Sequence, residues 1–370
     1  MPRNKRLHFK DIHALKALVF IPIYLFCILS LISPTNGGAL FEVTTIVGKI
    51  SQSSFDFLFF LTAFLVTSHG LREYKYTDGF SLKNFYLRRI LRLSVVLTLA
   101  LIFAFALHPW LIRILDLQPM VTPSMEPYFL LIPNYLSNFA GPQMIYFTLI
   151  CTVFMFLQFY IFWGIILRFF HNHLNLIALI LVGVGLVSRI LHQVNSSDYL
   201  MDTLAFGIPI GIGVLTAVAI RNDSAIVVKL KEVSKNANSF IYIVGCLLFL
   251  GGYILAANSY LTAVIPLFTG LFFGYVIIEQ TFGKNSFVQF KTKKILTYLG
   301  KISYGMLVYQ AIISVMMTIA IESLDQKLDS FYMIGIVIVA GFIGTVVVAD
   351  ISFKLLEKPL LRIRREFKKV

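Results

Sequence analysis

Charged residues are scarce in this chain of 370 residues, and acidic ones are the scarcest. Asp, Glu, Lys and Arg together make up 14% of the sequence, against about 25% in an ordinary soluble domain. Only 18 residues are acidic, against 32 Lys and Arg, while apolar residues make up 58%. This composition argues against a soluble enzyme and against a disordered chain, and it leaves a polytopic membrane protein.

Cysteine and the motifs of metal and nucleotide chemistry are also rare or missing. Three cysteines cannot staple a chain of this size, and they do not stand at a zinc-site spacing. The sequence contains no Walker loop, no HExxH helix and no glycine-rich dinucleotide motif. We therefore predict no metal site, and we do not expect an ATP-driven pump or a metalloprotease.

Long apolar runs are what the sequence does contain. A helix needs about 20 mostly apolar residues to cross roughly 30 Å of hydrocarbon, whereas a membrane β-barrel would show shorter alternating segments. We predict an all-α integral membrane bundle of about ten transmembrane helices, forming one domain over residues 1–370 with no appended soluble domain. The predicted spans are 13–33, 52–70, 92–113, 143–168, 174–192, 203–220, 238–256, 259–279, 300–320 and 331–353.

The net charge of +14 is explained by membrane topology rather than by a nucleic-acid partner. Lys and Arg gather in cytoplasmic loops, so we place both termini in the cytoplasm. In that orientation 28 of the 32 basic residues fall on the inner side, and the outer side has only Lys49, Arg113, Arg189 and Lys327. The lipid bilayer is the partner that follows from this pattern.

Charged residues inside the predicted spans are candidates for function, because each costs about 2.5–3.5 kcal/mol to insert at a helix centre. Asp56 lies early in the second span, Asp202 opens the sixth, and Asp350 lies near the inner end of the tenth. Aspartate is too short to snorkel, so we expect Asp56 and Asp350 to face a polar interior. Lys16 and Arg189 are long enough to snorkel to an interface, and for them both interpretations stay open.

The strongest local signal is the basic run FYLRRILRL at 85–93. On a helix, Arg89 and Arg92 lie three residues apart and Arg88 and Arg92 four apart, so each pair shares a face. Guanidinium groups bind phosphate oxygens bidentately, and the run lies where a cytoplasmic loop enters the third span. It indicates a polyanion clamp, with a positive-inside anchor as the alternative.

Four segments together resemble the acyltransferase-3 family of integral-membrane O-acyltransferases, over nearly the whole chain. They are LKALVFIPIYLF at 15–26, FDFLFFLTAFLVT at 55–67 followed by the basic run at 85–93, LGKISYGMLVYQ at 299–310 and LLEKPLL at 355–361. The resemblance implies a multi-pass protein of the bacterial inner (plasma) membrane. It also implies that an acyl group, acetyl as the first choice, moves from acyl-CoA to a hydroxyl of a cell-surface or lipid-linked carbohydrate.

The resemblance also suggests which residues bind the donor. The Arg-x-x-Arg pair that the family is thought to use for the coenzyme phosphates falls on Arg89 and Arg92, with Arg88 beside it. The basic residue of the family's first span falls on Lys16, which would hold phosphate as a point charge rather than as a fork. These four residues are the predicted acyl-CoA-binding set.

The catalytic end departs from the family pattern, because Cys27 stands where the family has a histidine in its first span. A sugar hydroxyl needs a base with a pKa near the operating pH. Three interpretations stay open. Asp56, or His69 if it folds inward, serves as the base. Cys27 accepts the acyl group as a thioester and passes it on. Or the chain has lost catalysis and works as a transporter of a glycan or lipid intermediate, or as a partner in an export complex.

Two further places depart from the family pattern. Phe156 and Leu157 occupy positions that are acidic in the family, and Tyr309 and Gln310 replace a Trp-His pair. The membrane scaffold and the donor clamp therefore match the family better than the catalytic end does.

Overall fold

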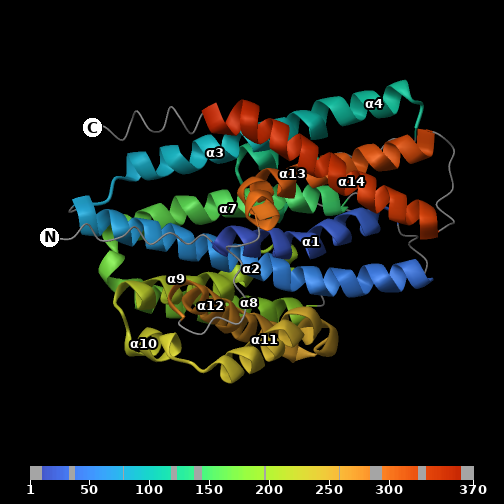
Figure 1. Ribbon diagram of the computed structural model, residues 1–370. Coiled ribbons are helices and arrows are strands. Elements are labelled where there is room, and N and C mark those ends of the chain that lie inside the picture. The colour runs from blue at the N-terminus through green and yellow to red at the C-terminus, as the bar shows by residue number, and fades with distance from the viewer. Residues whose placement is uncertain are drawn as a thin grey trace.

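The structure, a computed structural model, describes residues 11–32, 38–77, 79–117, 123–136, 144–195, 197–257, 259–283, 294–323 and 331–359. Within these ranges the chain forms helices and contains no strand (Figure 1). Ten helical segments in the same ranges are long and apolar enough to cross a membrane, and each overlaps one predicted span. The prediction of an all-α bundle of about ten transmembrane helices is confirmed.

The spanning segments follow one another along the chain, with short α-helices in two of the connections. They are α1 (Asp11–Ile32), α2 (Ala39–Thr77), α3 (Leu82–Ile102), which a π-helical turn at Phe103–Leu107 continues into α4 (His108–Ile114), α7 (Met144–Phe169), α8 (Leu174–Val194), α9 (Gly207–Arg221), α11 (Lys235–Leu255), α12 (Ile265–Phe282), α13 (Lys294–Ser323) and α14 (Phe331–Ser352), which a second π-helical turn at Phe353–Glu357 extends. The short helices are α5 (Glu126–Phe129), α6 (Pro133–Leu136) and α10 (Ala225–Lys231).

Helix α2 is the clearest difference from the predicted boundaries. The apolar run predicted a span over 52–70, but the helix has 39 residues and is about 58 Å long at 1.5 Å per residue. That length is nearly twice the hydrocarbon thickness of a bilayer. Hydropathy locates the apolar part of a helix, whereas residues such as Glu42 and Lys75, which form helices well in water, let it continue at both ends.

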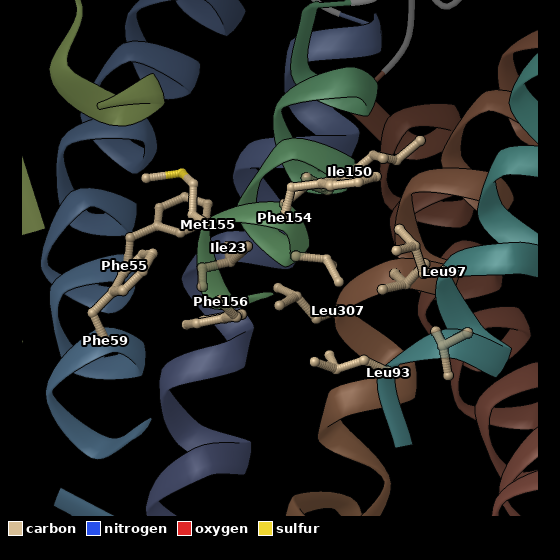
Figure 2. Packing of buried hydrophobic residues seen from close by; sticks show 14 of the residues in the cluster. Ile23, Phe55, Phe59, Leu93, Leu97, Ile150, Phe154, Met155, Phe156 and Leu307 are labelled. Carbon is tan, nitrogen blue, oxygen red and sulfur yellow. The ribbon is translucent and has the colours of Figure 1, made fainter. Parts of the chain in front are cut away.

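Helix α2 also joins the two halves of the bundle. On one side it packs against α1, which in turn packs against α13, and α3 and α7 complete this half. On the other side α2 packs against α9 and α11, with α8 and α12 around them (Figure 1). The core of the first half is dense with buried aromatic and aliphatic side chains, among them Ile23, Phe55, Phe59, Phe154 and Leu307 (Figure 2).

Helices α1 and α13 run in parallel with a constant register. The His13 ring donates to the Gly300 carbonyl at 3.4 Å near the start of both helices, and the Cys27 thiol donates to the Ser314 hydroxyl at 3.8 Å further along. Both pairs are separated by 287 residues. A Cβ atom at position 300 would lie 1.6 Å from the His13 carbonyl oxygen, so only glycine permits this approach.

Helix α1 begins on the same side of the bundle on which α14 ends (Figure 1). An even number of spans requires this arrangement. The assignment of that side to the cytoplasm remains a prediction from the distribution of Lys and Arg.

Candidate functional site

A pocket of about 100 Å³ lies between α1, α2, α3, α7 and α13, towards the ends at which α1, α3 and α13 begin. Its wall combines two basic residues with four hydroxyl groups and an apolar surface. The basic residues are Lys16 and Arg89, and the hydroxyl residues are Thr62, Tyr160, Ser303 and Tyr304. The apolar residues are Phe20, Leu58, Leu61, Leu65, Leu93, Phe156 and Leu307. Figure 2 shows three of them, Leu93, Phe156 and Leu307, which also belong to the core cluster.

Two of the four predicted donor-binding residues meet in this pocket. Lys16 comes from α1 and Arg89 from α3. The Arg89 guanidinium carbon lies 5.3 Å from the centroid of the Tyr160 ring and 6.0 Å from that of Phe85. Cation–π contacts of this kind orient a guanidinium without neutralising its charge. The pocket wall therefore brings one lysine and one arginine together.

The neighbouring Arg88 is separated from this pair. Its Nη2 donates to Glu73 Oε2 at 2.6 Å, and Glu73 Oε1 accepts from the backbone N–H of Ser81 at 3.1 Å. This ion pair ties the end of α2 to the start of α3 and neutralises Arg88. Adjacent residues of a helix point about 100° apart, so the two arginines take different roles. Arg92 lies on α3, and its side chain is outside the described part of the structure.

Cys27 is fully buried and is not among the residues that line the pocket. It lies on α1 two helical turns beyond Phe20, which does line it. The interposed Ile23 is 1% exposed and belongs to the apolar core. In this conformation apolar side chains therefore separate the Cys27 thiol from the pocket.

Asp56 forms a buried ion pair with Arg189, and the two side chains are 0% and 1% exposed. Tyr253 donates to Asp56 Oδ2 at 2.5 Å and accepts from Arg189 Nη1 at 2.6 Å. Arg189 Nε also donates to the Ala205 carbonyl at 2.7 Å. The interpretation that Arg189 snorkels to an interface is wrong, because its charge is balanced in the interior by an aspartate from another span.

His69 does not fold inward. It is exposed on the surface of α2, and its Nδ1 lies 2.6 Å from the Leu65 carbonyl one turn earlier in the same helix. Leu65 and Thr62 turn towards the pocket, whereas His69 does not line it. The condition under which His69 was a candidate base is therefore not met.

Asp350 also differs from expectation. It lies near the end of α14 with its side chain 24% exposed, and it pairs with Lys354 at 2.7 Å and accepts from Tyr298. The expectation that Asp350 faces a polar interior is wrong, because a lysine one turn away and partial exposure satisfy its charge at the periphery.

Asp202 lies between spans and is the centre of a hydrogen-bond network. It accepts from the hydroxyl of Ser188, from Tyr135 at 2.8 Å, from the backbone N–H of Leu204 at 2.9 Å and from His192 Nε2 at 3.2 Å. Burial by itself raises the pKa of Asp202, but the four donors stabilise the carboxylate more strongly, so its pKa ends below the ordinary value. The network ties the segment before α9 to α8 and α6.

The lowered pKa predicts a pH-dependent contribution of Asp202 to stability. A carboxyl whose pKa is lower in the folded state stabilises the fold above its unfolded pKa of about 4, and this contribution is lost as the pH falls through the folded value. We expect the melting temperature in detergent at pH 6 to be higher for wild type than for Asp202→Asn. This difference in melting temperature should become smaller below pH 4. A difference that does not change with pH would contradict the stabilising role of the Asp202 carboxylate.

Sequence reasoning missed the hydroxyl groups of the pocket. Ser303 and Tyr304 belong to the segment LGKISYGMLVYQ, and Thr62 belongs to FDFLFFLTAFLVT. Their position in two of the four segments that resemble the acyltransferase-3 family is the sequence signal that could have indicated them. Among the described residues, no group of three or more His, Cys, Asp or Glu side chains is placed to hold a metal ion.

Comparison of the chain with protein-family models, with curated proteins and with solved structures finds no match.

Proposed function

We propose that this protein is an O-acyltransferase of the bacterial inner membrane. It takes an acyl group, acetyl as the first choice, from acyl-CoA on the cytoplasmic side and transfers it to a hydroxyl of a cell-surface or lipid-linked carbohydrate. The observation that carries the proposal is the meeting of Lys16 and Arg89 in one pocket with hydroxyl groups and an apolar wall. An acyl-CoA combines phosphates with a short apolar acyl end, and this wall matches both.

The size of the pocket limits which part of the donor it takes. Clefts that bind drug-sized ligands enclose about 300–1,000 Å³, whereas this one encloses about 100 Å³. We therefore place the thioester end of the donor inside and the nucleotide at the surface, where the run at 85–93 begins α3. Arg92 belongs to the proposed binding set through its place in that run.

The geometry disfavours two of the three candidate catalytic groups, Asp56 and His69. Both oxygens of Asp56 accept hydrogen bonds from Arg189 or Tyr253, and His69 is on the outside of α2. We favour the covalent route through Cys27. The Cys27 sulfur attacks the thioester carbonyl while its proton passes to the departing sulfur, which leaves as CoA thiol. The acceptor hydroxyl then takes the acyl group and returns its proton to the Cys27 sulfur. This route requires the apolar side chains at Ile23 to move aside.

An inactive protein is the second candidate function. The residues that line the pocket include no carboxylate, imidazole or thiol, so the pocket can bind a donor without supplying a base or a nucleophile. Such a protein would be a transporter of a glycan or lipid intermediate, or a partner in an export complex.

Inverted membrane vesicles that contain the full chain distinguish the two, because the native membrane supplies the acceptor. Radiolabelled acetyl-CoA is added outside, and label is followed into glycan, lipid and protein fractions. We expect transfer by wild type, loss of transfer by Arg89→Ala, and a hydroxylamine-sensitive label on the protein that Cys27→Ala removes. Saturable binding without transfer would support the inactive candidate, and no binding at all would overturn the proposed acyltransferase.

A further inference from the structure

Two matching rows of side chains run from the pocket into the bundle. On α1 they are Lys16, Phe20, Ile23 and Cys27, and on α13 they are Ser303, Leu307, Gln310 and Ser314. Steps of four, three and four residues keep each row on one helix face. The constant register of 287 residues sets the rows opposite each other, level by level.

The four levels have different surroundings. Lys16, Phe20, Ser303 and Leu307, which form the first two levels, line the pocket. The Cys27–Ser314 hydrogen bond closes the fourth level. Gln310 therefore lies on the third level, one helical turn beyond the pocket wall.

Gln310 is the unusual member of these rows. Its side chain is fully buried, and neither Oε1 nor Nε2 has a hydrogen-bond partner among the described residues. Buried amides are normally paired, because an unsatisfied one is costly. Gln158 illustrates the normal case, since it donates to the Leu131 carbonyl and to Asn134 and accepts from Thr203. Gln310 thus keeps a donor and an acceptor unused in the interior.

We infer that Gln310 is the polar end of the donor pocket and binds the thioester of acyl-CoA; this inference rests on the proposed function. A primary amide offers both a donor and an acceptor. Nε2 donates to the thioester carbonyl oxygen, and Oε1 accepts the N–H of the amide that precedes the thiol in the pantetheine arm. Because Cys27 and Ser314 close the next level about 6 Å further along the helix, the acyl chain that fits beyond the carbonyl is short.

The test compares the affinities of free CoA and acetyl-CoA for the purified full-length protein. Free CoA lacks the carbonyl that Gln310 recognises, so we expect wild type to bind acetyl-CoA about tenfold more tightly, which corresponds to about 1.4 kcal/mol. Gln310→Met keeps the volume and removes the amide. It should abolish this preference and weaken the binding of acetyl-CoA more than that of CoA, because CoA loses only the contact with the pantetheine N–H. Gln280→Met makes the same change on α12, outside the pocket, and should keep the preference.

Thermal unfolding without ligand gives an independent readout. Gln310→Met should raise the melting temperature, because it removes a buried amide that has no partner. Gln280→Met should lower it, because Gln280 donates to Glu279 at 2.7 Å and to Tyr242 at 3.0 Å.

The possible results separate this inference from the proposed function. If wild type binds neither CoA nor acetyl-CoA, the proposed function fails and the inference fails with it. If wild type prefers acetyl-CoA and Gln310→Met keeps the preference, or loses affinity equally for both ligands, only the role of Gln310 is overturned. A fall in melting temperature for Gln310→Met would show an ordinary structural glutamine and would overturn it as well.

Discussion

Replacing Arg189 with methionine is expected to destabilise the protein by about 3–5 kcal/mol, because it leaves the Asp56 carboxylate buried without a cation. Asp56 is 0% exposed, and among the described residues the Tyr253 hydroxyl would be its one remaining hydrogen-bond donor. Methionine fills much of the volume of the arginine stem, so the loss comes from charge rather than from a cavity. The measurement is thermal or chemical unfolding of the purified protein in detergent, together with its abundance in membranes.

The paired change gives the control. Asp56→Leu with Arg189→Met removes both charges, and replacing a buried ion pair with apolar residues is often neutral or stabilising. We therefore expect the double variant to recover most of the stability that either single variant loses, with a large coupling energy in the cycle. If Asp56→Asn instead abolished acyl transfer with no effect on stability, Asp56 would be a catalytic base and the structural assignment would be wrong.

This ion pair shows where sequence reasoning stops. Each transmembrane span is a local property, because about 20 consecutive apolar residues are sufficient to specify it. All ten could therefore be predicted. Asp56 and Arg189 were both recognised as intramembrane charges, but they lie in the second and fifth spans. Their pairing depends on how α2 packs near α8 and α9, and one sequence contains no local signal for that packing.

The basic run shows the same limit at closer range. Helical spacing predicted which arginines share a face, but it could not assign different roles to the adjacent Arg88 and Arg89. Glu73, at the end of another helix, neutralises the first, and Tyr160, from a third helix, lies beside the second. Gln310 was visible as a departure from the family pattern, yet its unpartnered amide could be recognised only once its surroundings were known.

Replacing Arg89 with alanine is expected to weaken acetyl-CoA binding by about 10- to 100-fold. A hydrogen bond to a charged group contributes about 1.5–3 kcal/mol, and each 1.4 kcal/mol is a factor of ten in affinity. Arg89→Lys should recover part of this loss, because lysine keeps the charge but not the planar fork. The measurement is the dissociation constant of acetyl-CoA for the purified protein, taken at two salt concentrations.

Arg88→Ala is the matched control, because it removes the same charge from the next position of the same helix. Its partner Glu73 ties α2 to α3, and both side chains are partly exposed at 17–29%. We therefore expect a stability loss of about 1 kcal/mol or less and an acetyl-CoA affinity within about threefold of wild type, which is less than 0.7 kcal/mol. Equal loss of affinity in Arg88→Ala and Arg89→Ala would mean that the basic run at 85–93 attracts anions only as a diffuse basic patch. The proposal that the pocket binds acyl-CoA would then be wrong.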